Sequence, residues 1–243
     1  MKPRVIIPWF PGTNCHWETK HAFEKAGADG RIVLLKQLLD GRVRLTDADL
    51  IALAGGFSWG DHLRAGYVAA MDFVYLLRDQ LLEAVERQIP MIGICNGFQM
   101  LVTAGLLPGG QGIGKPTALL DNNASARFEH WNRTVIYLHK PSGIDCLWVK
   151  GLDGHKMYLP VGHGEGQLVL LDGSAVLNVV ATYGTMSGDA SYPVSPNGSA
   201  VAGICDPTGR IIGLMPHPER RTDSEHGGVY GLPIFQAGVN AVK

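Results

Sequence analysis

The sequence predicts an α/β fold, in which a mostly parallel β-sheet lies between two layers of helices. In the first half of the chain, short apolar runs alternate with segments of helical spacing, a pattern typical of a parallel sheet covered on both faces. The second half holds many more strand-like runs, which predict an antiparallel extension of that sheet. The chain has 243 residues, enough for one large core, and shows no repeat or linker. We therefore expect a single domain over residues 1–243.

The first half justifies the parallel part of the sheet. The run RVIIPWF predicts a first strand, and the spacing that follows it predicts a helix from about Cys15 to Ala26. Two β-rich runs, RIVLLKQ and DLIALAGG, predict the next two strands. A long amphipathic pattern then predicts a helix over residues 67–88. The run PMIGIC predicts a fourth strand, and a helix is expected from Asn96 to Leu107.

The second half is richer in strands. The apolar runs that predict them are RTVIYL, LWVKGL, KMYLPV, QLVLL, NVVATY, SAVAGICD and RIIGLMP. Few helical patterns separate these runs, so neighbouring strands can follow one another directly, as they do in antiparallel sheets.

Composition narrows the class of protein. The formal net charge is −1, whereas nucleic acids and anionic membranes call for a basic excess, so neither is expected as the main partner. No apolar run approaches the ~20 residues of a membrane span, and the start of the chain does not read as a signal peptide. We expect a cytoplasmic protein. The four cysteines have no paired spacing, which favours free thiols.

The segment GICNG places Cys95 between the fourth strand and the helix that follows. Glycines two residues before and after a nucleophile permit the tight strand-to-helix turn called a nucleophile elbow. The helix N-terminus stabilises a thiolate, and the N–H of Asn96 is placed to bind the oxygen of an attacked carbonyl. A small buried cysteine at a strand end is the alternative interpretation.

A thiolate nucleophile needs a base and a group that orients the base. His217, in GLMPHPER, directly follows an apolar run, and the flanking prolines favour an extended loop. In an extended chain Glu219 faces the same side as His217 and can support the imidazole. The glycine pair in ALAGGFSW, Gly55 and Gly56, can supply a second N–H for an oxyanion. Read alone, these segments also fit a surface loop and an ordinary glycine turn.

Three other patterns are less convincing. The run GGQGIGKPT imitates a phosphate-binding loop, but Pro116 stands where a serine or threonine is needed, and no strand precedes it. Cys15 and His16 are adjacent, so their side chains diverge, and packing at the start of a helix is favoured. Neither HGEG nor HPER has the spacing of a helical zinc site, and no metal site is predicted.

Taken together, the segments GICNGFQ, GGFSWGDHLRAG, HGEG, SPNGS and MPHPER, with FPGTNC near the start, resemble the class I (triad type) glutamine amidotransferases. Within that class they are most similar to the glutaminase subunits of phosphoribosylformylglycinamidine synthase, from purine biosynthesis. The matching segments run from residue 8 to residue 221, and RFEHWNRTV matches least well. The resemblance implies a flavodoxin-like three-layer sandwich.

The resemblance also implies roles for individual residues. It makes Cys95 the nucleophile, His217 the base and Glu219 the support of the base. Backbone N–H groups of Gly56 and Asn96 would bind the oxyanion. The substrate glutamine would contact Gln99 and, as a weaker match, His163.

The implied activity is glutamine hydrolysis to glutamate and ammonia through a γ-glutamyl thioester on Cys95. No cofactor is expected in this chain. ATP and magnesium would belong to a large synthetase subunit that aminates formylglycinamide ribonucleotide, and a further candidate partner is a small third subunit. Two alternatives remain, a stand-alone hydrolase of γ-glutamyl or other amides with the same triad, and a non-enzymatic regulatory partner.

Overall fold

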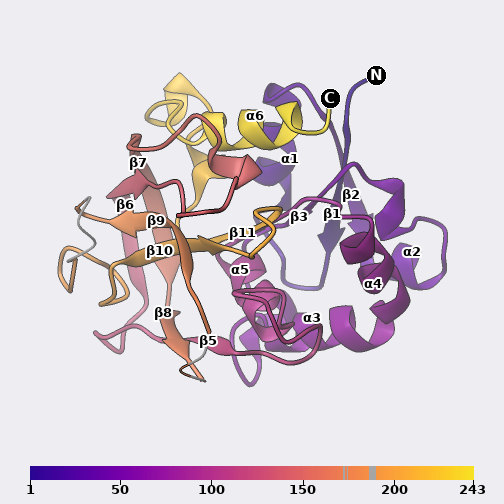
Figure 1. Cartoon of the computed structure of the whole chain (residues 1–243), viewed down its shortest axis with the longest axis horizontal. Coiled ribbons are helices and arrows are strands. Elements are labelled where there is room, and N and C mark those ends of the chain that lie inside the picture. Colours follow the sequence, from indigo (N-terminus) through magenta and orange to yellow (C-terminus); the bar gives the residue numbers. More distant parts are fainter. Residues whose placement is uncertain (172, 174, 186–189) are drawn as a thin grey trace.

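A computed structural model of the chain describes residues 1–171, 173, 175–185 and 190–243. Its main feature is a nine-stranded sheet in that described part, with a separate two-stranded sheet beside it (Figure 1). The order of the large sheet is β2 (Asp29–Leu34), β1 (Arg4–Trp9), β3 (Leu50–Leu53), β4 (Met91–Ile94), β11 (Ile211–Leu214), β10 (Val201–Cys205), β9 (Asn178–Tyr183), β6 (Glu129–Leu138) and β7 (Lys156–His163). The small sheet pairs β5 (Ala118–Asn122) with β8 (Glu165–Leu170).

The sheet divides into a parallel half and an antiparallel half. Every pairing from β2 through β1, β3 and β4 to β11 is parallel, and every pairing from β11 to β7 is antiparallel. The predicted fold class, a mostly parallel sheet with an antiparallel extension, is confirmed. Because β3, β4 and β11 are parallel neighbours, their carboxyl ends meet at one edge, where ligand sites of α/β folds gather.

Helices cover the parallel half on both sides. They are α1 (His16–Lys25), α2 (Leu35–Leu39), α3 (Tyr67–Met71), α4 (Arg78–Glu86), α5 (Asn96–Thr103) and α6 (Leu232–Asn240). Figure 1 shows α1 and α6 together on one side of the sheet and α3 and α5 together on the other. Phe23 of α1 and Phe235 of α6, both fully buried, meet edge to face with their ring centroids 5.0 Å apart.

Several element boundaries differ from the sequence expectation. The helix expected over 67–88 is α3, a π-helical turn (Asp72–Leu76) and α4, with a break at Leu77. The run LWVKGL, predicted as a strand, is instead a 3₁₀ turn (Leu147–Val149). This prediction was wrong because burial alone does not separate a strand from a packed turn: Trp148 is buried against Phe23 and bonds the Arg210 carbonyl through Nε1.

Short irregular turns link the longer elements. The remaining 3₁₀ turns in the described part of the chain are Leu45–Asp47, Ser58–Asp61, Pro218–Arg220 and Ser224–His226.

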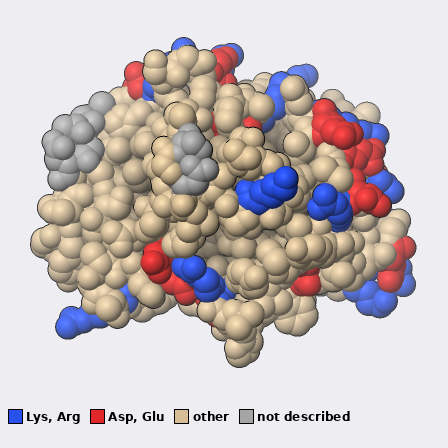
Figure 2. Space-filling model, turned by 60° about the horizontal axis from the view of Figure 1, so that its bottom comes forward, with Lys and Arg blue, Asp and Glu red and all other residues tan. Residues whose placement is uncertain are grey.

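Charged side chains are distributed unevenly, and on the face seen in Figure 2 they gather mainly near one side, leaving wide uncharged areas. Within the described part of the chain, no helix is both long and apolar enough to cross a bilayer.

Candidate active site

Cys95 lies on a strained turn at the carboxyl end of β4. Its backbone has φ 51° and ψ −106°, and it serves as the N-cap of α5. A positive φ is costly for a residue with a side chain, and such strain is concentrated at functional sites. The Cys95 N–H donates to the Leu214 carbonyl at 2.7 Å, which fixes the turn to β11.

The glycines around Cys95 serve packing rather than the turn. A Cβ on Gly97 would lie 2.0 Å from the Leu53 carbonyl oxygen, and one on Gly93 would lie 2.5 Å from that of Gly97. Neither glycine has a positive φ, whereas Cys95 does. The glycines permit the tight turn by letting α5 approach the sheet closely, while the cysteine itself carries the strained backbone.

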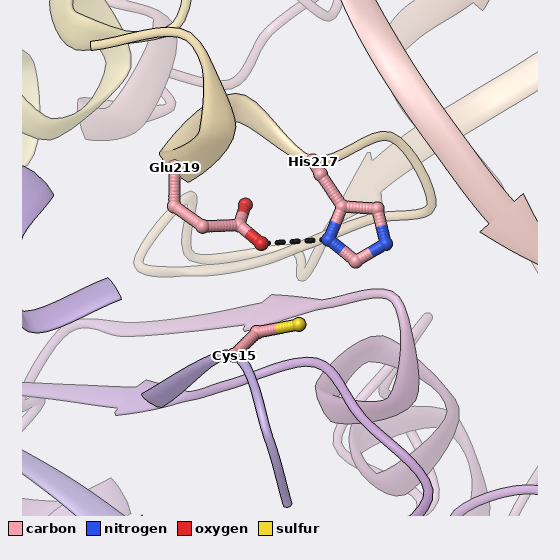
Figure 3. A group of neighbouring side chains, drawn as sticks. All are labelled: Cys15, His217 and Glu219. Carbon is pink, nitrogen blue, oxygen red and sulfur yellow. Dashed lines mark hydrogen bonds and ion pairs between the residues drawn. The ribbon is translucent and has the colours of Figure 1, made fainter. Parts of the chain in front are cut away.

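His217 and Glu219 form a buried pair beyond the end of β11. His217 Nδ1 and Glu219 Oε1 are 2.6 Å apart, and the two side chains are 3% and 0% exposed (Figure 3). The backbone N–H of His217 donates to the Pro160 carbonyl, which ties the loop to β7. With Nδ1 occupied by Glu219, Nε2 is the nitrogen left for the thiol.

The charges around His217 favour its protonated form. Burial alone would lower the pKa of His217, but the Glu219 carboxylate and the sulfurs of Cys95 and Cys15 raise it well above its ordinary value. An imidazole with this bias can take a proton from the Cys95 thiol and hold it. The Cys95 Sγ also lies 3.5 Å from the Gly162 carbonyl oxygen.

The second thiol near the triad is Cys15, which precedes α1 and is 1% exposed. Figure 3 shows its sulfur beneath the His217–Glu219 pair. Arg220 Nη2 donates to Cys15 Sγ at 3.0 Å. Packing at the helix start was expected for Cys15; its closeness to the triad was not, because it comes from the folding of distant segments.

Cys15, His217 and Glu219 offer a sulfur, a nitrogen and an oxygen within 4.8 Å of one another, a set that could in principle hold a metal. Two features oppose this. The 2.6 Å between Nδ1 and Oε1 leaves no room for an ion bound to both, and the Arg220 guanidinium already occupies the sulfur. The set is better interpreted as a hydrogen-bonded support for the imidazole.

The glycine corner after β3 lies at the same cavity as Cys95. Gly56 lines the same cavity as Cys95 and has φ +145°. A Cβ there would lie 2.6 Å from the Asn14 nitrogen, so only glycine fits. The neighbouring groups are fixed, because Gly55 O accepts from the Cys15 N–H and the Phe57 N–H donates to Gly12 O. Within the described residues, no backbone carbonyl accepts the Gly56 N–H.

Gln99 is held rather than free. Its Nε2 donates to the Glu165 carbonyl at 2.6 Å, and its Oε1 accepts from Asn96 Nδ2 at 3.0 Å. Asn96 Nδ2 donates in addition to Asp61 Oδ1 at 2.9 Å. Gln99 still lines the cavity, so it can contact a ligand by packing while it positions the strand that carries Glu165.

His163 is a neutral histidine in the wall of the same cavity. Asn123 Nδ2 donates to the carbonyls of Arg127 and His163, so Asn123 Oδ1 is the acceptor that faces His163 Nδ1 at 2.9 Å. Nδ1 therefore carries the proton, and the buried Nε2 is an acceptor with no partner among the described residues. Burial, and to a smaller extent the charge of His217, lower the pKa of His163 to about 3.

Gly56, Cys95, Gln99 and His163 share one cavity of about 160 Å³. It is lined by Gly56, Phe57, Asp61, Ala65, Cys95, Gln99, Asn122, Phe128, Gly162, His163, Gly164 and Glu165. A cavity of this size suits a small ligand such as an amino acid. A larger cavity of about 580 Å³ is lined by Glu219 together with Trp17 and Asp223, among others. Cys95 is not among its lining residues.

Comparison with known proteins identifies the family. The family model described as the CobB/CobQ-like glutamine amidotransferase domain matches residues 2–230. The chain belongs to this family. The amidotransferase is 41% identical over 228 residues to the phosphoribosylformylglycinamidine synthase subunit PurQ of Dehalococcoides mccartyi, covering 90% of this chain and 86% of that protein. The protein of the same name from Thermotoga maritima is 34% identical, with both chains covered completely.

Solved structures agree with the fold of the amidotransferase. A chain of the structure of PurLQS from Thermotoga maritima superposes with a TM-score of 0.80 at 34% identity, covering both chains completely. A glutamine amidotransferase from Thermotoga maritima has a TM-score of 0.55 at 16% identity, over 90% of this chain and 77% of the other, and shares the fold. The resemblance drawn from the sequence motifs is confirmed.

Sequence reasoning overlooked Asp61, Asn123 and Asn197. Asn197, in SPNGS, is fully buried and its Nδ2 donates to the Gly166 and Val201 carbonyls, so it supports the HGEG segment without lining the cavity. The segment GGFSWGDHLRAG already contains Asp61, and a polar residue among glycines was the signal available there. For Asn123 and Asn197, nothing in the spacing indicates the partners that fold against them.

Proposed function

We propose that this amidotransferase is the glutaminase subunit of a phosphoribosylformylglycinamidine synthase. It releases ammonia from glutamine for a separate ATP-dependent synthetase subunit that aminates formylglycinamide ribonucleotide. The observation that carries the activity is that Cys95, in the wall of one small cavity, interacts with the buried imidazole of His217, which Glu219 holds in place. The curated relatives, which bear this name and match along nearly their whole length, support the choice of pathway.

In the first half-reaction, Cys95 Sγ attacks the side-chain amide carbon of glutamine as its proton passes to His217 Nε2. The resulting oxyanion lies between the N–H groups of Gly56 and Asn96. Collapse of this intermediate breaks the carbon–nitrogen bond, and the proton held by His217 leaves with the ammonia. The product on the enzyme is a γ-glutamyl thioester of Cys95.

In the second half-reaction, water attacks the thioester while His217 removes its proton. Glu219 holds Nδ1 throughout and stabilises the imidazolium that forms twice in the cycle. Glutamate leaves, and the Cys95 sulfur regains its proton from His217. Gln99 and His163 act in this proposal as cavity-wall residues that receive the substrate. Neither half-reaction consumes ATP, which with magnesium is assigned to the synthetase subunit.

The synthetase partner and a cytoplasmic location belong to the same proposal. The solved relative described as PurLQS supports a complex in which a small third subunit joins the glutaminase and the large synthetase. Free ammonia is protonated at neutral pH and loses its nucleophilicity, which favours direct transfer within a complex.

The test is glutamate release by the purified chain, alone and with a synthetase subunit, its nucleotide acceptor and ATP. The proposal predicts release that depends on Cys95 and amination that uses the ammonia. Release at the same rate without any synthetase would instead favour a stand-alone amide hydrolase. A complete lack of release in every mixture would favour a non-enzymatic partner.

A further inference from the structure

We propose that Asp61 is the residue that selects glutamine by binding its α-ammonium group. This inference rests on the proposed glutaminase function and deepens it. Asp61 lies in the cavity that holds Cys95, on the turn Ser58–Asp61, and no role follows for it from the triad chemistry.

The carboxylate of Asp61 is partly buried without a compensating cation. Its Oδ1 accepts from Asn96 Nδ2 at 2.9 Å and from the Gly66 N–H at 3.4 Å. Across the described residues, Asp61 has no Lys, Arg or His nitrogen within 4.0 Å, and Oδ2 has no hydrogen-bond donor. Burial raises the pKa of Asp61. The two hydrogen bonds from Gly66 and Asn96 offset only part of this rise, and the charge of Glu165 adds to it. A half-buried carboxylate with a free oxygen is a site for a cation.

The position of Asp61 suits the far end of glutamine. Asn96 Nδ2 binds both Asp61 Oδ1 and Gln99 Oε1, so Asp61 lies over the first turn of α5. Two methylene groups separate the reacting amide carbon of glutamine from its α-carbon. The α-ammonium of a glutamine bound at Cys95 therefore stays within the same small cavity that Asp61 lines.

The loop is built to hold Asp61 in place. Trp59, Asp61 and Leu63 all have positive φ, a costly backbone that persists only where surrounding contacts impose it. Trp59 Nε1 anchors the loop by donating to Asp72 Oδ2 at 2.8 Å.

Glu165 is the other carboxylate of the cavity, and it is already partnered. Its two oxygens accept from the Ala65 N–H at 3.3 and 3.2 Å, and its Oε2 lies 3.8 Å from Arg64 Nε. A carboxylate with a guanidinium beside it attracts a second cation less strongly. Asp61 is therefore the better partner for an ammonium group.

The test compares glutamine with glutaramate, which has the same amide but no α-amino group. Ammonia release is measured for both with the complete complex. The substitution Asp61→Asn keeps an oxygen that can accept from Asn96 Nδ2 and removes the charge. We expect kcat/KM for glutamine to fall by about 10²-fold, the cost of leaving a desolvated charge unpaired. The loss should appear in KM, because the ammonium is remote from the reacting bond. The value for glutaramate should stay essentially unchanged.

The control is Asp79→Asn, which makes the same change of charge on α4, away from the residues that line the cavity. It should leave the preference for glutamine intact. Equal losses for both substrates in Asp61→Asn, or an unchanged KM for glutamine, would overturn the assignment. So would Glu165→Gln abolishing the preference while Asp61→Asn retains it. Failure of the wild-type complex to release ammonia from glutamine would instead reject the proposed function itself.

Discussion

At the scale of single residues, the site depends on a few groups whose protonation is set by their surroundings. Glu219 and the two sulfurs raise the pKa of His217, while burial holds His163 neutral. The sequence indicated Cys95, His217 and Glu219 because each stands beside a glycine or proline pattern with a chemical reason. It could not indicate that Cys15 reaches the same imidazole, because that contact joins segments about 200 residues apart.

The first residue-scale prediction concerns Glu219→Gln. The amide still bonds His217 Nδ1 but stabilises the imidazolium poorly, so glutamate release should fall by about 10⁴-fold while some activity remains. Steady-state glutamate release, with circular dichroism as a check of folding, measures this. Turnover equal to wild type would show that Glu219 has only a structural role.

The second concerns His163 and acid stability. The pKa of His163 is about 3 in the folded protein and about 6.5 in an unfolded chain, so between these values the unfolded state binds more protons. The free energy of unfolding should therefore decrease as pH falls from about 6.5 toward 3. His163→Gln should make that decrease shallower in urea titrations at several pH values. Parallel pH profiles for the two proteins would contradict the assigned neutral state.

At the scale of elements, the site is made by loops that leave the carboxyl ends of neighbouring parallel strands. The alternation of apolar runs and helices was enough to predict that sheet, and the prediction is confirmed. The 3₁₀ turn Leu147–Val149 was missed because its pattern is as apolar as a strand. The helix α6 was missed although Pro233 lies in its first turn, a common helix start, because Gly238 and the β-branched Ile234 and Val239 weaken its pattern.

Gly56→Ala tests the glycine corner. A Cβ at this position meets backbone atoms of the segment before α1, so the corner must move and the proposed oxyanion N–H with it. We expect a loss of about 10²–10³-fold in kcat, the effect of removing one oxyanion donor. Gly41→Ala is the control: it also adds a Cβ to a glycine of positive φ, at φ +68° and a cost of about 1 kcal/mol, but that Cβ would meet nothing within 4 Å. Equal kcat values in the two variants would reject Gly56 as a donor.

At the scale of the whole molecule, the residues of the proposed chemistry come from segments spread along most of the chain. The motifs at residues 8–221 indicated its family before any geometry was known, and the family assignment is confirmed. The individual site roles stay predictions.

The stretch 127–135, which lies in and around β6, was the part of the site that the sequence predicted least well. Phe128 there reaches the cavity only because β6 pairs with β7, a long-range contact that local spacing does not encode.

The synthetase subunit should stimulate the chain. Glutamine hydrolysed without an acceptor is wasted, so we expect glutaminase activity to rise by about 10²–10³-fold in the complex with nucleotide and ATP, the worth of one correctly oriented oxyanion donor. The corner at Gly55 and Gly56 is more firmly hydrogen-bonded than its glycines suggested, so any reorientation there must break the bond between the Cys15 N–H and Gly55 O. Glutamate release with and without the partner measures the effect, and an equal rate would contradict it.

The most direct test of the account is to trap the covalent intermediate. The complex is mixed with glutamine, quenched in acid within a turnover and digested, and the cysteine peptides are examined by mass spectrometry. The account predicts a γ-glutamyl adduct on the peptide that contains Cys95. Cys95→Ala should show no adduct and no glutamate release, while its complex still aminates the nucleotide with added ammonia. Cys15→Ala should retain the Cys95 adduct and most of its activity. An adduct on Cys15, or glutamate release by Cys95→Ala, would show that Cys95 is not the nucleophile.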